Sequence, residues 1–352
     1  MLTKTCLSRE YLLNIAKKYQ VNPMFLTSNI ASLFLVEALK QQKLSFVLRG
    51  GQAMNLLLHE PMRLSTDVDI IVAPNMEMGD IVEHIGATFP FQRYEEERRE
   101  FYKGIPKKHY KFWYESPLDQ SMQFISLDIV FESMDTSNYV EHSMQSIFTE
   151  SDGEDVIVLV PDLNRQLGEK LTIIGNPRLR ADLDPIIGYK VIKQIYDCAT
   201  LFKEITSFSD VRSFFEMEAK KQLKYYKLSL SVEEMLLSMF QTCMCIMLRG
   251  TIAGREYQQY LPGIYEITKY TLSKQPPIEE AAGCAGIVSY IAACMLMPED
   301  DCIDVNSSDC ETKMSIVDFE KLEYIKEYSP DIYVYIVRAF QKIEKYIANK
   351  KN

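Results

Sequence analysis

The sequence predicts an α+β fold, in which a mixed sheet with flanking helices is followed by a helical C-terminal bundle. Residues 8–43 carry apolar side chains at helical spacing, whereas residues 44–160 contain short β-rich runs bounded by Gly, Pro, Asn or Ser. From about residue 167 the helical pattern returns and continues to the end of the chain. A sheet domain followed by a helical domain is the simplest arrangement of these elements.

Two domains follow from this change of pattern. We expect the first over residues 1–165, beginning with the helical segment 1–43. The second covers residues 166–352, and its first part, 166–205, carries a Lys/Asp motif described below. Of the 352 residues, 47% are hydrophobic, which is enough for each domain to form its own core.

The expected elements can be placed along the chain. Strands are expected where β-branched and aromatic residues cluster, over residues 44–50, 68–74, 109–116, 122–132 and 155–161. Helices are expected over residues 52–59, 76–86, 186–205, 232–250, 276–296 and 329–347. The acidic segment 298–313 interrupts the helices. Its Asp-x-Asn-x-Ser run lacks the glycine and the final glutamate of a calcium loop, so we expect a solvated loop there.

Composition restricts the class of protein. The N-terminus lacks the apolar segment of a signal peptide, and the apolar stretch at about residues 287–297 is too short to span a bilayer. We therefore expect a cytoplasmic protein in which that stretch is a buried helix. The eight cysteines include no C-x-x-C pair, which favours buried, reduced thiols over a zinc site. The net charge of −10 means that a nucleic-acid partner needs a local basic patch.

The stretch GGQAMNLLLHEPMRLSTDVDIIV, from Gly50 to Val72, combines a glycine turn with paired aspartates. Gly50 and Gly51 follow a strand and lead into a helix, whose free N–H groups can bind phosphate. Asp67 and Asp69 are two residues apart at the start of a strand, so both carboxylates project to the same face. Mg²⁺ prefers such oxygen ligands together with substrate phosphates. The pattern indicates a nucleotidyl-transfer site, although the glycines alone could form a plain turn and Asp67 could cap one.

A third carboxylate, Asp128, lies among apolar residues of a later strand. Its burial costs free energy unless it is hydrogen-bonded or binds a metal ion. If its strand lies beside the one that carries Asp67 and Asp69, three carboxylates can hold two metal ions for an in-line displacement. A buried, hydrogen-bonded aspartate without a catalytic role is the alternative.

Three segments together resemble the AbiEii/AbiGii family, the toxin half of type IV toxin–antitoxin and abortive-infection systems. They are FVLRGGQAMNLL…RLSTDVDI, GEKLTIIG at 168–175 and IKQIYDCATLF at 192–202. The family belongs to the polymerase-β-type nucleotidyltransferase superfamily, and the resemblance covers nearly the whole chain. It implies a polymerase-β-like nucleotidyltransferase sheet, two Mg²⁺ ions, an NTP substrate and a cognate antitoxin encoded nearby.

The resemblance also implies roles for individual residues. Asp67, Asp69 and Asp128 would bind metal, and Lys170 would contact the triphosphate. The remaining matched positions are Gly50, Gly51, Ser65 and Lys193 for nucleotide binding, and Asp197 as the acidic residue of the last motif. This chain departs from the family pattern at Gly51, where many relatives have serine, at Arg49, where lysine is common, and at Thr27-Ser28-Asn29.

Simpler interpretations of the distal residues stay open. Lys170 lies near an expected helix, where a lysine is usually solvent-exposed, and an exposed lysine contributes little to stability. Lys193 and Asp197 are four residues apart and could form a surface ion pair worth about 0.3–0.5 kcal/mol. His109, in KKHYKFWY, stands beside basic and aromatic residues that could meet a nucleotide or RNA, but an ordinary strand surface is the more usual interpretation.

The leading functional hypothesis, by resemblance, is transfer of a nucleotide from an NTP to a tRNA 3′ end. Between residues 165 and 227, 12 basic residues stand against 8 acidic ones, a modest excess that suits phosphate contacts at one end of a tRNA. The first alternative is nucleotide transfer to a protein hydroxyl, with the same metals and the same triphosphate contacts. The second is a non-catalytic nucleotide-binding protein that acts through its helical domain as an interaction module.

Overall fold

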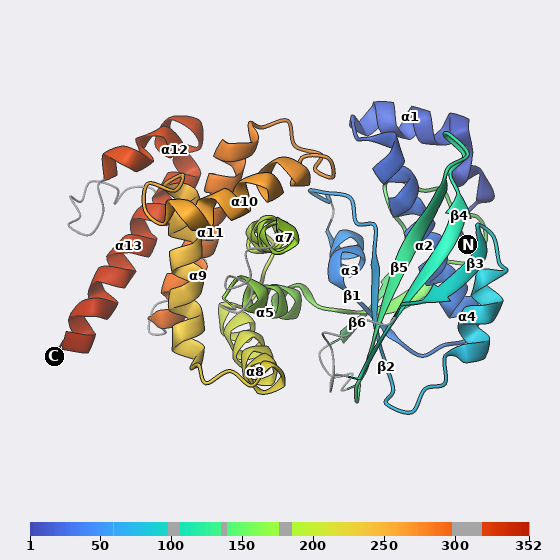
Figure 1. Cartoon of the computed structure of the whole chain (residues 1–352), viewed down its shortest axis with the longest axis horizontal. Coiled ribbons are helices and arrows are strands. Elements are labelled where there is room, and N and C mark those ends of the chain that lie inside the picture. Colours follow the sequence, from blue (N-terminus) through green and yellow to red (C-terminus); the bar gives the residue numbers. More distant parts are fainter. Residues whose placement is uncertain (59, 98–105, 135–138, 176–184, 298–318, 352) are drawn as a thin grey trace. The chain divides into compact units, whose positions relative to one another are not determined.

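The computed structural model describes residues 1–58, 60–97, 106–134, 139–175, 185–297 and 319–351 (Figure 1). The chain forms two compact units. Unit 1 comprises Met1–Asp162 and Lys269–Ser273, and unit 2 comprises Leu163–Thr268 and Lys274–Asn352. The acidic segment expected to be a solvated loop, 298–313, lies outside the described residues.

Unit 1 contains a seven-stranded mixed sheet in the order β3-β4-β5-β2-β1-β7-β6. β2 runs parallel to β5 and β1 parallel to β7, while the other neighbours are antiparallel. The strands are β1 (Val47–Arg49), β2 (Val68–Val72), β3 (Phe91–Glu96), β4 (Lys107–Glu115), β5 (Met122–Phe131), β6 (Tyr139–Ser143) and β7 (Ile157–Pro161). The mixed sheet predicted from the sequence is confirmed, and all five expected strands are present.

Two strands, β3 and β6, were not expected. They lie at the two ends of the sheet order, where only one side of a strand is paired. Phe91 is the one buried residue of β3, and β6 has none. Edge strands carry polar residues on both faces, so FQRYEE and YVEHS lack the apolar pattern by which a strand is recognised.

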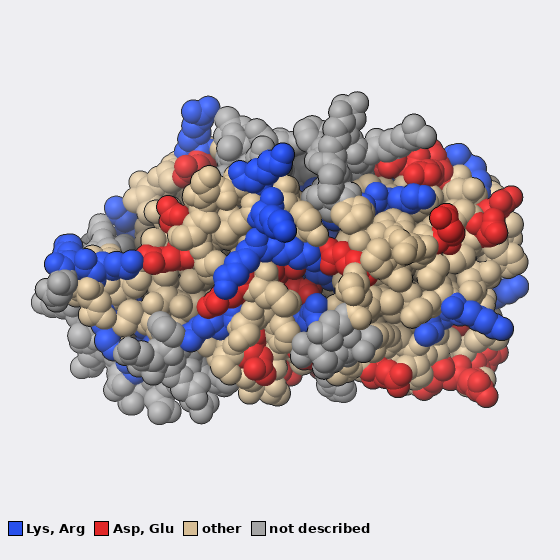
Figure 2. All heavy atoms as spheres, turned by 90° about the horizontal axis from the view of Figure 1, so that it is seen from below, with Lys and Arg blue, Asp and Glu red and all other residues tan. Residues whose placement is uncertain are grey.

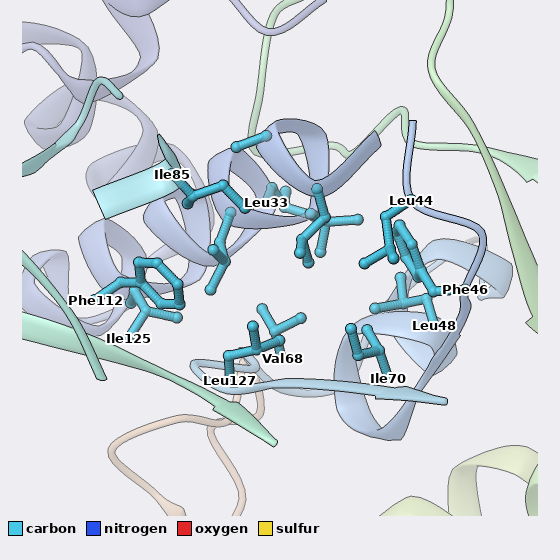
Figure 3. Packing of buried hydrophobic residues seen from close by; sticks show 14 of the residues in the cluster. Leu33, Leu44, Phe46, Leu48, Val68, Ile70, Ile85, Phe112, Ile125 and Leu127 are labelled. Atoms are coloured by element: carbon cyan, nitrogen blue, oxygen red, sulfur yellow. The ribbon is translucent and has the colours of Figure 1, made fainter. Parts of the chain in front are cut away.

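The helices of unit 1 are η1 (Lys4–Leu7), α1 (Arg9–Tyr19), α2 (Pro23–Gln41), α3 (Gly50–Leu57) and α4 (Gly79–Gly86). Helices α2, α3 and α4 pack on one face of the sheet, whereas η1 and α1 pack against α2 in a second apolar cluster. Helix α2 begins where the Asn22 side chain accepts a hydrogen bond from the Met24 N–H, with Pro23 in the first turn. Figure 3 shows Leu33 of α2 and Ile85 of α4 among side chains such as Val68 that project from the sheet. Alternate residues of the same strands therefore face away from this core.

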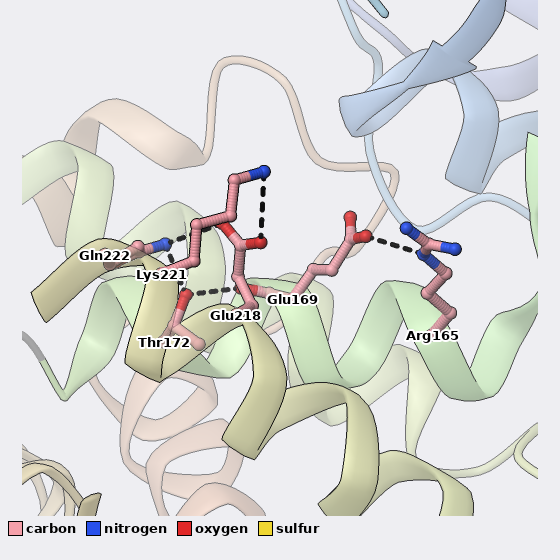
Figure 4. Close-up of polar contacts among 6 residues, drawn as sticks. All are labelled: Arg165, Glu169, Thr172, Glu218, Lys221 and Gln222. Carbon is pink, nitrogen blue, oxygen red and sulfur yellow. Dashed lines mark hydrogen bonds and ion pairs between the residues drawn. The ribbon is translucent and has the colours of Figure 1, made fainter. Parts of the chain in front are cut away.

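Unit 2 is helical, as predicted for the C-terminal part of the chain. Its helices are α5 (Leu163–Ile174), α7 (Pro185–Leu201), α8 (Phe208–Tyr226), α9 (Val232–Met247), α10 (Gly254–Ile267), α11 (Pro277–Leu296), η5 (Phe319–Leu322), α12 (Glu323–Tyr328) and α13 (Pro330–Lys351). Polar contacts join α5 to α8 beside the apolar packing: Gln222 Nε2 donates to Thr172 Oγ1 at 2.7 Å (Figure 4). Within α5, Arg165 pairs with Glu169 at 2.8 Å.

The apolar segment near residue 287 belongs to α11, which is longer than the stretch considered in the sequence. With 20 residues, α11 has the length and composition to cross a membrane, but 89% of its apolar window is buried inside the structure. Its interpretation as a buried helix is confirmed. Five cysteines in the described part of the chain are free and buried, as expected, whereas Cys294 of α11 is disulfide-bonded. The expectation of reduced thiols is therefore wrong at Cys294.

Candidate active site

Strand β1 runs directly into helix α3, and the junction requires glycine. Gly50 has φ of +71°, a conformation that favours glycine, and a Cβ atom at this position would overlap Asp69 Oδ2. A Cβ atom on Gly51 would overlap Ser65 Oγ and lie 3.0 Å from an Arg63 nitrogen. The two glycines therefore allow the first turn of α3 to approach Asp69 and Ser65 closely, which a plain strand–helix turn does not need.

Asp69 and Asp128 lie side by side on neighbouring parallel strands. The register pairs Asp69 of β2 with Asp128 of β5, and pairs Asp69 with Arg49 of β1 on its other side. Neighbouring strands are about 4.8 Å apart, and directly paired residues project to the same face. Because Ile70 of β2 is part of the core, the two aspartates project from the opposite face. The predicted adjacency of the two strands is confirmed. Asp67 stands one residue before β2 and is half-buried.

Basic side chains surround these carboxylates. His109 of β4 is paired with Asp128, and its Nδ1 lies 2.6 Å from Asp128 Oδ1. The His109 side chain is 7% exposed, whereas that of Asp128 is 33% exposed. Burial lowers the pKa of Lys107, and the positive charge of Arg49 lowers it further, while Asp128 and Asp69 act in the opposite direction. Lys107 is thus electrostatically coupled to both aspartates. The placement of Lys107 and His109 beside the aspartates depends on the β4–β5 register, which the sequence does not reveal.

Asp69 and Asp128 suit a hard cation. In the described part of the chain, no three acidic, histidine or cysteine side chains are gathered closely enough to hold a metal ion. Of the three carboxylates expected from the sequence, Asp69 and Asp128 are the two that the strand register pairs directly. Mg²⁺ commonly takes one or two protein carboxylates and completes its shell with water and substrate phosphates. The pair beside the N-terminus of α3 fits that donor set.

A buried polar network holds the segment that leads to Asp67. Asn29 Nδ2 and Gln52 Nε2 both donate to the Ser65 carbonyl, at 2.7 and 2.8 Å. Arg63 Nη1 donates to the Leu64 carbonyl at 2.9 Å. All four side chains of Asn29, Gln52, Arg63 and Ser65 are at least 98% buried. Asn29 belongs to the segment where this chain departs from the family pattern, and the structure gives it a supporting role that sequence reasoning did not assign.

The distal pair lies in unit 2. Lys170 of α5 donates to Asp197 Oδ2 of α7 at 2.8 Å, and their side chains are 9% and 1% exposed. The expectation of an exposed Lys170 is therefore wrong, because the lysine packs between two helices. The alternative of a surface ion pair between Lys193 and Asp197 is also wrong, since Asp197 is buried. Beside them, burial raises the pKa of the Cys198 thiol, while Lys170 acts to lower it.

Comparison with known proteins identifies the family of the chain. The family model for the nucleotidyl transferase AbiEii toxin of type IV toxin–antitoxin systems matches residues 33–261. No curated protein sequence matches the chain.

Two solved structures are similar to it. One is an antigenic nucleotidyltransferase-like protein from Paracoccidioides brasiliensis, at 13% identity, with 57% of this chain and 90% of that chain covered and a TM-score of 0.36. The other is JHP933 from Helicobacter pylori, at 14% identity, with 76% and 98% covered and a TM-score of 0.29. The family match spans the glycine turn, the aspartate pair and the Lys170–Asp197 pair, and the chain belongs to the AbiEii nucleotidyltransferase toxin family.

Proposed function

We propose that this protein is a Mg²⁺-dependent nucleotidyltransferase that transfers a nucleotide from an NTP to the 3′ hydroxyl of an RNA, namely a tRNA. The observation that supports it best is the placement of Asp69 and Asp128 on one sheet face, with Gly50 at the N-terminus of α3 against Asp69. A helix N-terminus beside two carboxylates combines a phosphate site with a metal site.

The chemistry assigned to the chain's own residues follows from this placement. The N–H groups at Gly50 and Gly51 bind the triphosphate, and Ser65 shapes that turn. Asp69 and Asp128 would hold Mg²⁺, together with Asp67 at the edge of the site. Bound Mg²⁺ neutralises phosphate charge and stabilises the attacking and leaving oxygens.

In the transfer step the acceptor oxygen forms a bond to the α-phosphorus. The bond from that phosphorus to the oxygen bridging the α- and β-phosphates breaks, pyrophosphate leaves, and the hydroxyl proton passes to water.

The resemblance assigns Lys170 and Lys193 to the nucleotide and Asp197 to the acidic position beside them. In the ligand-free chain Lys170 and Asp197 neutralise one another. Contact between Lys170 and a phosphate therefore requires an exchange of partners, which a point-charge ammonium on a flexible stem can make. Until substrate binds, this buried pair holds α5 against α7.

The partners follow from the family and from charge. Membership of a type IV toxin–antitoxin family implies a cognate antitoxin, and we place the protein in the cytoplasm, where tRNA and NTPs are available. On the face drawn in Figure 2, basic side chains form a short contiguous run with acidic side chains beside it. This distribution suits a contact with one end of a tRNA better than an extended groove for a duplex.

The test has two parts: the pure protein and Mg²⁺ are incubated with total RNA, total protein and each labelled NTP in turn, and the protein is expressed in bacteria, where we expect growth arrest. We expect label on RNA of tRNA size, and loss of both label and growth arrest in Asp69→Ala, because the metal then lacks a ligand. Label that appears on protein and never on RNA, with Asp69 still required, would move the acceptor to a protein hydroxyl. Growth arrest that persists in Asp69→Ala, without label anywhere, would favour the interaction module.

A further inference from the structure

The sheet face that carries the aspartates continues into a cluster of rings and cations. We call this cluster the stacking surface; it consists of Arg93 on β3, Lys111 and Trp113 on β4, and Phe124 on β5. The Trp113 and Phe124 ring centroids are 5.1 Å apart. The Arg93 guanidinium lies 4.3 Å from the Trp113 ring and Lys111 Nζ lies 5.0 Å from the Phe124 ring. Phe124 is 42% exposed, which is unusual for a phenylalanine in a strand.

The strand register shows that the stacking surface and the aspartates share one face. Trp113 is paired with both Arg93 and Phe124, and His109 is paired with Asp128. Directly paired residues project to the same side, and positions two or four apart along a strand do so as well. Phe124 and Asp128 are four residues apart on β5, a separation of about 13 Å at the usual strand rise. The surface therefore lies within reach of a substrate whose reacting end is at Asp128.

The order of the strands indicates whether the NTP or the acceptor lies over the stacking surface. β1 and the N-terminus of α3 lie next to β2 on the side opposite β5. In an in-line displacement the attacking and leaving oxygens are on opposite sides of the phosphorus. If the leaving pyrophosphate is held at Gly50, the acceptor approaches over β5 and β4, where Trp113 and Phe124 lie.

We propose that the stacking surface binds the unpaired bases next to the 3′ end of the RNA acceptor. This inference rests on the proposed function and deepens it by assigning the acceptor's contact. Single-stranded nucleic acids are bound by base stacking on aromatic rings and on arginine planes, which is what Phe124 and Arg93 present around Trp113. Glu97 lies 3.0 Å from Lys111 and offsets its charge, so Arg93 carries the remaining positive charge of the surface. Its rings suit bases, while Lys107 near Asp128 is placed for the terminal phosphate.

The chain supplies its own probe, because Trp113 is its one tryptophan. We would titrate the full-length Asp69→Ala protein, which cannot turn over, with a short single-stranded RNA and with a blunt RNA duplex, following tryptophan fluorescence. The single strand should quench the emission at lower concentration than the duplex. Phe124→Ala should raise the dissociation constant by roughly 5- to 100-fold, the range expected from loss of one stacked ring.

Phe89 offers a matched control. It is 43% exposed, with the Phe34 ring at 5.5 Å and Lys4 Nζ at 5.2 Å, so its surroundings resemble those of Phe124. Phe34 belongs to α2, on the helix-covered face of the sheet. Phe89→Ala should leave RNA binding unchanged. In the active protein, Phe124→Ala should raise KM for RNA with little change in kcat.

The outcomes separate this inference from the proposed function. Transfer to RNA that requires Asp69, without quenching and with equal KM for Phe124→Ala and Phe89→Ala, would overturn the stacking surface and leave the function standing. Quenching by NTP alone would also overturn it, because the rings would then bind the donor base. Quenching by single-stranded RNA that Phe124→Ala weakens, without any transfer to RNA, would support the surface while the proposed function fails.

Discussion

Replacing Lys170 by alanine should destabilise unit 2 strongly, although nearly every exposed lysine in a helix can be replaced at little cost. The substitution leaves the Asp197 carboxylate, 1% exposed, without the ammonium that lies 2.8 Å away. Removing one partner of a buried ion pair costs about 3–5 kcal/mol, because the remaining charge stays desolvated. For a unit of this size, that loss corresponds to a fall in melting temperature of roughly 6–20 °C.

The assay is urea unfolding of the purified protein without ligand, with Lys220→Ala as the control. Lys220 also pairs with an acidic residue on its own helix, Glu216 at 3.7 Å, but the two side chains are 69% and 46% exposed. The free energy of unfolding should change by about 0.5 kcal/mol or less in this variant. The double variant Lys170→Met/Asp197→Leu should recover most of the stability, because apolar replacements of similar volume remove both buried charges.

Two results would refute the reasoning. If Lys170→Ala costs no more than Lys220→Ala, the lysine is solvated and the contact with Asp197 is not a buried pair. If the double variant is as unstable as the single one, packing rather than uncompensated charge explains the loss. Nucleotide transfer by the double variant gives a separate answer: a stable but inactive protein assigns Lys170 or Asp197 to the substrate as well as to the fold.

Two further substitutions test the turn at the site and a buried carboxylate. Gly50→Ala should destabilise the protein by about 1–2 kcal/mol because of the φ of +71° alone, and it should weaken NTP binding because the new Cβ displaces Asp69. Gly79 has open space around it, so Gly79→Ala should change neither thermal unfolding nor NTP titration. Burial raises the pKa of Glu37 above 4.5, although the Leu2 N–H bond opposes the shift. The folded state therefore binds the Glu37 proton more tightly than the unfolded state does. The free energy of unfolding falls as the pH rises from about 4.5 through the raised pKa of Glu37. Glu37→Gln should be the more stable protein at neutral pH, and urea unfolding should show the advantage vanish below pH about 4.5; an advantage that persists there would exclude the carboxylate as its cause.

The sequence predicted the central strands and the glycine turn because these depend on local pattern. Buried strands such as β2 and β5 need long β-rich runs, and a close approach of backbone to Asp69 needs glycine, so both leave a signal in the residues themselves. The edge strands β3 and β6 have no such signal in their sequences, because their side chains are mostly exposed and few of them need to be apolar. Their exposed polar residues read as connecting segments.

The partners of the charged residues could not be predicted for a different reason. That Asp128 meets His109 depends on the pairing of β4 with β5, and that Asp197 meets Lys170 depends on the packing of α7 against α5. Neither arrangement can be predicted from the spacing of residues along the chain. Four-residue spacing indicates Lys193 as a neighbour of Asp197, but it gives no sign of Lys170, which comes from another helix.

The charge balance of the site suggests how the ligand-free chain tolerates two adjacent aspartates. Asp69 and Asp128 project from strands about 4.8 Å apart, where two carboxylates repel one another. Lys107 is electrostatically coupled to both, and His109 lies 2.6 Å from Asp128. Burial and Arg49 together lower the pKa of Lys107, so its proton is held less tightly than that of an ordinary lysine. Lys107 and His109 thus lie where they offset the repulsion between the two carboxylates, and in the proposed reaction a divalent ion would take over that part.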